Sequence, residues 1–71
     1  MNNDKLRQAI ELVIKNGGSG SMLSRHMRLS YRETGELMTE LEELGVLGEF
    51  NGARPRKVLI NDISDLNIKG L

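Results

Sequence analysis

Arginine and lysine are gathered in two stretches of this 71-residue sequence, and both stretches lack acidic residues. The first stretch covers residues 17–32 and the second covers residues 50–57. Their basic residues are Arg25, Arg28, Arg32, Arg54, Arg56 and Lys57. Guanidinium and ammonium groups bind phosphate oxygens, so the two stretches favour contact with a polyanion. The equal totals of 10 basic and 10 acidic residues do not exclude this, because segregated charges create local fields.

Acidic residues are concentrated between the two basic stretches. Residues 33–49 contain no basic residue and hold Glu33, Glu36, Glu40, Glu42, Glu43 and Glu49. Carboxylates repel phosphates, which opposes nucleic-acid binding by this stretch. Two interpretations of Glu36 stay open. It follows Arg32 by four residues and can pair with it on a helix, or it can accept a hydrogen bond from a cytosine amine in the major groove of DNA.

Catalytic and metal-binding chemistry have little support in the sequence. There is one histidine, His26, and there is no cysteine, so neither a Ser/His/Asp set nor a thiolate metal site is expected. The run Gly17-Gly18-Ser19-Gly20 lacks the lysine of a phosphate-binding P-loop. We therefore predict that this chain is not an enzyme and binds no cofactor or metal ion.

Apolar spacing predicts three helices, over residues 4–16, 20–27 and 30–44. Ser19 is placed to cap the second helix, and Ser30 with Glu33 has the spacing of a capping box for the third. Gly17 and Gly45 are expected to end the first and third helices, because glycine tolerates left-handed backbone. No apolar run approaches the roughly 20 residues that cross a bilayer, and the predicted location is cytoplasmic.

Two short strands are predicted after the helices, over residues 46–47 and 57–60. Asn51-Gly52 supplies a tight turn between them. Three helices and a hairpin predict an α+β fold, the winged helix-turn-helix, with a C-terminal β-hairpin wing. The winged-helix domain is expected to span residues 1–60, and residues 61–71 form a tail that is either docked or flexible.

This architecture predicts a function in binding double-stranded DNA. The recognition helix, about residues 30–44, would enter the major groove, and the wing, about residues 49–57, would contact the sugar-phosphate backbone. The predicted DNA-binding residues are Arg25, Arg28, Arg32, Glu36, Arg54, Arg56 and Lys57.

Four segments also resemble the C-terminal gamma domain of the FtsK/SpoIIIE DNA translocases. They are residues 22–31 (MLSRHMRLSY), 37–38 (LM), 41–48 (LEELGVLG) and 51–59 (NGARPRKVL). The resemblance implies a winged helix that recognises short G-rich sequences, a role in chromosome segregation and a nucleoid-associated location. In some members of the family, this domain also contacts a Xer tyrosine recombinase.

Residues 32–36 depart from the pattern of that family. The family has Asn-Arg-Ala-Ala-Arg there, whereas this chain has Arg32-Glu33-Thr34-Gly35-Glu36. Both arginines that would read guanine are glutamate, so we expect a DNA target altered from the G-rich motif. The alternative is a protein-interaction module that contacts a recombinase or a translocase through an acidic third helix. The initiating methionine favours a free-standing protein over a piece of a translocase, and the sequence assigns no oligomeric state.

Overall fold

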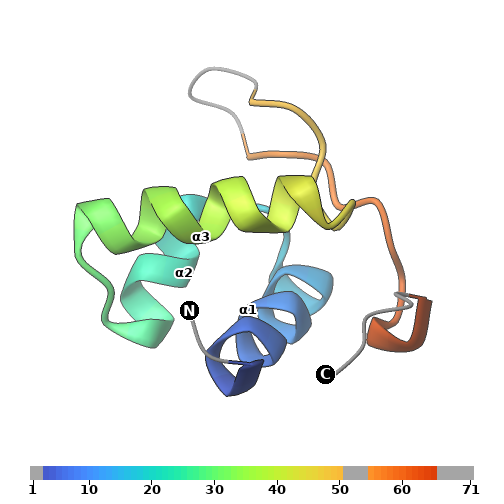
Figure 1. Cartoon of the computed structure of the whole chain (residues 1–71), viewed down its shortest axis with the longest axis horizontal. Helices are drawn as coiled ribbons and strands as arrows, with labels where there is room; N and C mark the ends of the chain where they lie inside the picture. Colours follow the sequence, from blue (N-terminus) through green and yellow to red (C-terminus); the bar gives the residue numbers. More distant parts are fainter. Residues whose placement is uncertain (1–2, 51–54, 66–71) are drawn as a thin grey trace.

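Three α-helices and a short 3-10 helix make up the described part of the chain (Figure 1). The structure is a computed structural model that describes residues 3–50 and 55–65. Its elements are α1 (Asn3–Asn16), α2 (Gly20–Met27), α3 (Tyr31–Glu43) and η1 (Ile63–Asp65). The helices predicted over residues 4–16, 20–27 and 30–44 are confirmed, with ends that differ by one residue at most.

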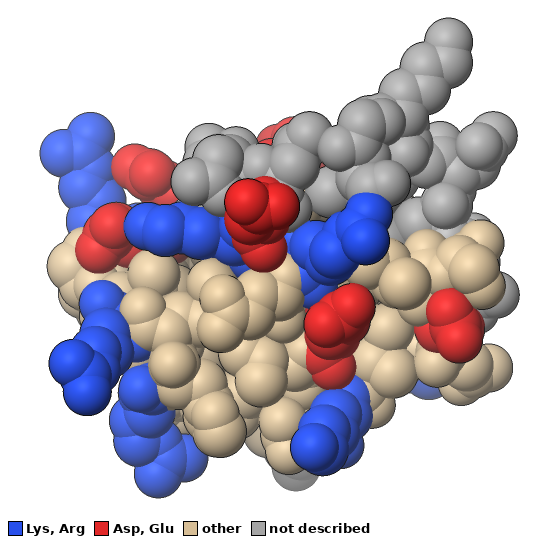
Figure 2. Space-filling model, turned by 90° about the horizontal axis from the view of Figure 1, so that it is seen from below, with Lys and Arg blue, Asp and Glu red and all other residues tan. Residues whose placement is uncertain are grey.

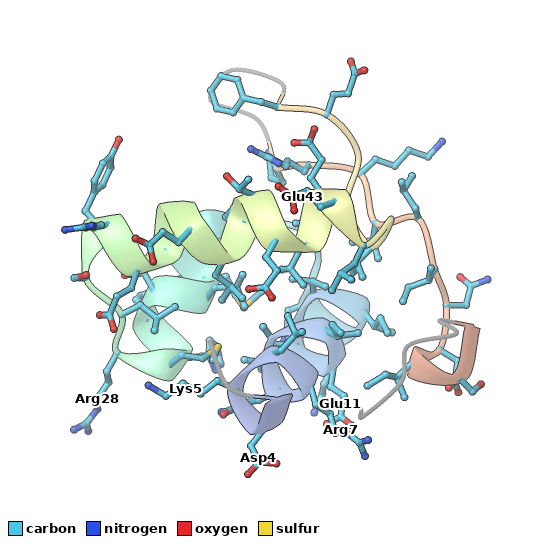
Figure 3. The ribbon with its side chains drawn as sticks, in the orientation of Figure 1. Asp4, Lys5, Arg7, Glu11, Arg28 and Glu43 are labelled. Carbon is cyan, nitrogen blue, oxygen red and sulfur yellow. The ribbon has the colours of Figure 1, made fainter. Side chains whose placement is uncertain are left out.

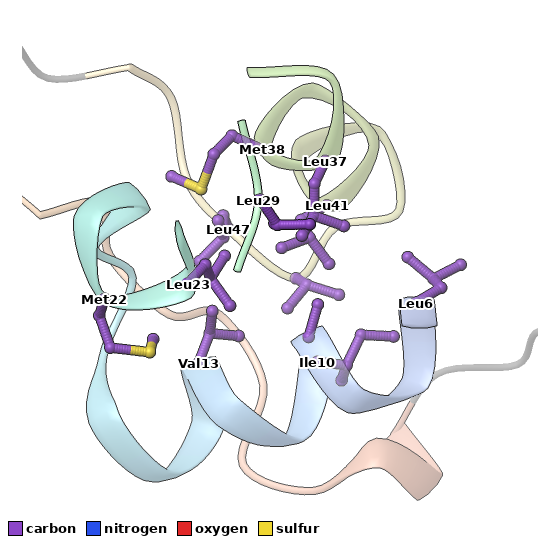
Figure 4. Packing of buried hydrophobic residues seen from close by; sticks show 12 residues of the cluster. Leu6, Ile10, Val13, Met22, Leu23, Leu29, Leu37, Met38, Leu41 and Leu47 are labelled. Atoms are coloured by element: carbon purple, nitrogen blue, oxygen red, sulfur yellow. The ribbon is translucent and has the colours of Figure 1, made fainter. Parts of the chain in front are cut away.

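The core forms where α1, α2 and α3 meet, and all of its buried side chains are apolar (Figure 4). It contains Leu6, Ala9, Ile10, Val13, Met22, Leu23, Leu29, Leu37, Met38, Leu41, Val46 and Leu47. On α3, Leu37, Met38 and Leu41 recur at helical spacing, so one face of this helix covers the other two helices. The opposite face of α3 is left to charged and polar residues.

The predicted helix ends are confirmed. Gly17 and Gly45 have φ angles of 98° and 81°, in the left-handed region that glycine adopts at little cost. The hydroxyl of Ser19 accepts a hydrogen bond from the Met22 N–H at 3.3 Å, as an N-cap of α2. Both bonds of the predicted capping box between Ser30 and Glu33 are present at the start of α3.

The predicted β-hairpin wing is wrong for the residues that the structure describes, and so is the α+β fold class. Residues 46–47 and 57–60 form no strand, and pairing is limited to isolated bridges between Gly18 and Arg56 and between Leu47 and Val58. The Arg56 N–H donates to the Gly18 carbonyl at 3.0 Å, so the incoming segment divides its pairing between two partners and no ladder develops. The predicted Asn51-Gly52 turn lies outside the described residues.

Residues 46–48 and 56–60 are held in place by packing against the core and by a few backbone hydrogen bonds. Val46 and Leu47 are fully buried, and Val58, Ile60 and Ile63 pack against the core from the other end of the segment. In Figure 1 the chain from residue 55 onward runs from above α3 down to η1, which lies beside α1. The described part of the tail, through η1, therefore contacts the helical domain.

Gly18 stands at the closest approach between the α1–α2 connection and this segment. A Cβ atom there would meet the Arg56 carbonyl oxygen and would lie 2.9 Å from Leu47 Cδ2. Glycine is therefore required at this position by space. Gly35, in the middle of α3, has no such neighbour within 4 Å of an added Cβ.

These two glycines make a matched test of the packing. We expect Gly18→Ala to lower the free energy of unfolding by about 1–3 kcal/mol, because the added methyl overpacks the junction. Gly35→Ala should raise it by about 0.5–1 kcal/mol, because alanine is the better helix former. Urea unfolding followed by circular dichroism measures both, and equal effects of the two substitutions would contradict this packing.

Candidate nucleic-acid interface

The connection between α2 and α3 is a tight turn built around Arg28. Its backbone is left-handed, with φ 54° and ψ 52°, and it is the one non-glycine residue with positive φ among the described residues. The N–H groups of Arg28 and Leu29 both reach the Ser24 carbonyl, and the Ser24 hydroxyl donates to the Leu29 carbonyl at 3.0 Å. Leu29 is buried, so the backbone is anchored while the Arg28 side chain extends into solvent (Figure 3).

The next turn of chain occupies the Glu33 carboxylate. Glu33 Oε1 accepts the Ser30 N–H at 2.9 Å, and the Glu33 N–H donates to the Ser30 hydroxyl at 3.1 Å. The backbone N–H of Ser30, then its hydroxyl and finally the charge of Lys5 lower the pKa of Glu33. This carboxylate is therefore ionised at neutral pH and hydrogen-bonded at the start of α3. A negative charge there also interacts favourably with the helix dipole.

Arg32 and Glu36 form the i,i+4 ion pair that their spacing predicts. Arg32 Nε lies 3.2 Å from Glu36 Oε1, and the two side chains are 90% and 65% exposed. An exposed pair of this kind contributes only about 0.3–0.5 kcal/mol to stability. Its structural role in the free protein is small, and both side chains stand in the first turns of α3.

The structure adds a basic residue from α1 to this end of the molecule. Lys5 acts on the Glu33 carboxylate through its charge and lies on the same side as Arg28 in Figure 3. We call the set Lys5, Arg25, Arg28 and Arg32 the basic end. Figure 2, which views the molecule from below, shows several basic side chains at this end of the face, with acidic ones beside some of them.

In the second predicted basic cluster, Arg54, Arg56 and Lys57, the Arg56 side chain does not extend into solvent. Arg56 Nη1 binds Glu42 Oε1 at 2.8 Å, and its side chain is only 12% exposed. Its guanidinium also lies 5.6 Å from the Phe50 ring centroid, within range of a cation–π contact. Arg56 is thus engaged inside the molecule, Lys57 is exposed, and Arg54 lies outside the described residues.

The two clusters address different parts of α3. Arg32 is in its first turn, whereas the Glu42 partner of Arg56 is in its last turn, about 15 Å further along the axis. Contact with DNA stays a prediction for all of the proposed residues, which are Arg25, Arg28, Arg32, Glu36, Arg54, Arg56 and Lys57. The geometry brings Arg25, Arg28, Arg32 and Glu36 to one end of the molecule. It pairs Arg56 with Glu42 in the last turn of α3, although Arg56 also lines a groove that contains Tyr31.

Two exposed aromatic residues were missed by the sequence reasoning. Tyr31 is 96% exposed at the start of α3, and Phe50 is 72% exposed. They line a groove of about 450 Å³ whose other walls include Gly20, Thr34, Met38 and Pro55. The exposure of Tyr31 could have been predicted from its place directly after the helix cap, because the first residue of a helix there lies beyond the core. No feature of the sequence indicated Lys5, because only tertiary packing brings α1 to this end.

Metal binding requires clustered ligands, and membrane spanning requires a long apolar helix. Among residues 3–50 and 55–65, no group of three or more His, Cys, Asp or Glu residues is placed to hold a metal ion. Within the same residues, no helix is long and apolar enough to cross a membrane.

A small three-helix domain with a basic end at its α2–α3 turn is the class of protein that these features define. Comparison with known proteins identifies it further. A family model described as the FtsK gamma domain matches residues 1–61. The chain belongs to this family.

Curated relatives agree with the family match. The chain is 39% identical over 59 residues to the DNA translocase FtsK of Bacillus cereus, covering 82% of this chain and 7% of that protein. It is 41% identical over 58 residues to the DNA translocase FtsK of Corynebacterium efficiens, covering 80% of this chain and 6% of that protein. It is 38% identical over 55 residues to the DNA translocase SpoIIIE of Bacillus subtilis, covering 76% and 7%.

The match is therefore to one small part of much longer proteins. The chain corresponds to about 7% of the length of these relatives. No solved structure matches the chain.

The capping box predicts a pH dependence of stability. Because the folded-state pKa of Glu33 lies below the ordinary value of 4.5, its contribution is complete above that value and is lost as pH falls through the lowered pKa. Glu33→Gln should therefore be less stable than the wild type at neutral pH, and the difference should shrink in acid. Thermal unfolding across this range measures it; a difference that does not change with pH would contradict the assignment.

Proposed function

We propose that this FtsK gamma domain is a double-stranded DNA-binding module that docks through its basic end. The single observation that carries the proposal is the exposed set Arg25, Arg28 and Arg32 at the α2–α3 turn of a chain whose relatives are named DNA translocases. A short helix, a three-residue turn and a longer helix follow the order of a helix-turn-helix motif, in which the second helix enters the major groove. The exposed face of α3 is the surface that this proposal places against base edges.

The basic residues divide into two roles in this proposal. Arg25 and Arg28 lie on or just after α2, which supports contact with phosphates and positioning of the domain on the duplex. Arg32 lies in the first turn of α3 and supports contact with a base. Since Glu33 and Glu36 replace the family arginines, the preferred sequence differs from the G-rich target implied by the resemblance.

A protein partner is the alternative function, favoured by a specific observation. Glu43 is exposed on the face of α3 away from α1 (Figure 3), and Glu40 precedes it by one turn. Carboxylates in this arrangement suit a basic protein surface, such as that of a tyrosine recombinase or of a DNA translocase. Nucleoid association follows from the DNA-binding proposal and has the same support.

Salt dependence tests the DNA-binding proposal. With three or four phosphates neutralised, log K for a short duplex should fall against log salt with a slope of about −3 to −4. Fluorescence anisotropy of a labelled duplex between low and physiological salt measures the slope. Absence of binding at low salt would overturn DNA binding and favour the protein-partner alternative.

Arg28 separates DNA contact from folding. Arg28→Gly should raise the free energy of unfolding by about 1 kcal/mol, because glycine adopts the left-handed conformation without strain. The same substitution should weaken duplex binding for all sequences alike and reduce the salt slope by about one. A more stable variant with unchanged DNA affinity would show that Arg28 does not contact phosphate.

A further inference from the structure

The Arg32–Glu36 pair leaves one edge of the arginine available for a ligand. Glu36 Oε1 engages the Nε atom of Arg32, at 3.2 Å. Among the described residues, the terminal nitrogens Nη1 and Nη2 form no hydrogen bond. A guanidinium held at Nε therefore presents its two terminal NH₂ groups together, as a pair of parallel donors on the exposed side chain.

This pair of donors matches one base edge in the major groove. Guanine offers two acceptors there, O6 and N7, whereas adenine offers one acceptor and one donor. A guanidinium has donors alone, so its terminal edge bonds guanine twice and meets a repulsive amine on adenine. The arrangement therefore selects guanine over adenine.

From this geometry, we infer that Glu36 is a positioning residue that aims Arg32 at a guanine. The inference rests on the proposed DNA-binding function and names the base that its α3 surface reads. Glu36 itself touches no base. Its carboxylate restricts the rotamers of Arg32 before binding, so less side-chain freedom is lost when the base is contacted.

The same pairing accounts for a carboxylate on a surface that approaches phosphates. Glu36 cancels the charge of Arg32, so the pair adds no net attraction to the duplex and contributes through geometry alone. The pair is weak while both side chains are in water. It strengthens when the groove displaces that water, because the charges are then less screened. Glu36 thus lowers general affinity and raises discrimination, and this combination of signs is testable.

The experiment begins with duplexes selected by the wild-type protein from a random library. Each guanine of the selected sequence is replaced in turn by 7-deazaguanine, which lacks the N7 acceptor. Binding is measured for the wild type, Arg32→Ala, Glu36→Gln and the matched control Glu40→Gln. The control removes the same charge one turn further along α3, and thermal unfolding checks that every variant is folded.

We expect that replacing one particular guanine by 7-deazaguanine weakens wild-type binding about 5- to 10-fold. The same replacement should not change the affinity of Arg32→Ala. Glu36→Gln should reduce that sensitivity by about 3-fold or more, because Arg32 must then be ordered on binding. It should also bind unrelated duplexes more tightly than the wild type. Glu40→Gln should share the gain in general affinity but keep full sensitivity to the guanine.

Four other results would overturn the inference. Full sensitivity in Glu36→Gln would show that the carboxylate does not aim Arg32, and sensitivity that survives in Arg32→Ala would show that another residue reads the base. Binding with no sequence preference would remove base reading while leaving the proposed function intact. Failure of the wild type to bind any duplex at low salt would overturn both the inference and the proposed function.

Discussion

The tight turn between α2 and α3 is the constraint on which the candidate interface depends. Arg28 reverses the chain in a left-handed conformation, buried Leu29 anchors it to the core, and Ser30 starts α3 immediately afterwards. Ser24 ties the turn back to α2 through two kinds of hydrogen bond. Because hydrogen bonds and packing hold the backbone at each of these points, the Cα atoms of the exposed arginines on either side of the turn have fixed positions. Glycine would adopt this left-handed conformation at lower cost than arginine does.

The acidic residues of α3 are less free than their number suggests. Glu33 caps the helix, Glu36 binds Arg32, and Glu42 binds the largely buried Arg56 side chain. Each of these carboxylates therefore acts within the molecule before it meets a partner. The charge left on the surface is set by these local pairings more than by the composition of residues 33–49. The α2–α3 end of the surface therefore exposes Arg25, Arg28 and Arg32, although residues 33–49 are acidic.

Family membership and architecture carry different information in this domain. The match to the FtsK gamma domain covers residues 1–61, but residues 46–60 form only isolated bridges among the described residues. The part of the chain best defined as regular structure is the set of three helices, and the candidate interface lies on them. The proposed specificity of this chain rests on α3 and on the pairing of Arg32 with Glu36.

Helices, their ends and the Arg32–Glu36 pair were predictable from the sequence, because these features depend on residues at most four positions apart. Apolar spacing identified the faces of α1 and α3 that are buried, and Ser30 with Glu33 identified the start of α3. Features that join distant residues were not predictable. The hairpin prediction failed because Arg56 is engaged elsewhere. Its N–H donates a hydrogen bond to the carbonyl of Gly18, some forty residues earlier in the chain, and its side chain forms an ion pair with Glu42. Lys5 joined the basic end only because tertiary packing brings the start of α1 to the same side of the molecule as Arg28. Local hydrogen bonds and apolar periodicity depend on short stretches of sequence and can be predicted from them. The long-range partner of a backbone N–H or of a long charged side chain depends on which surfaces the packing of the core brings together.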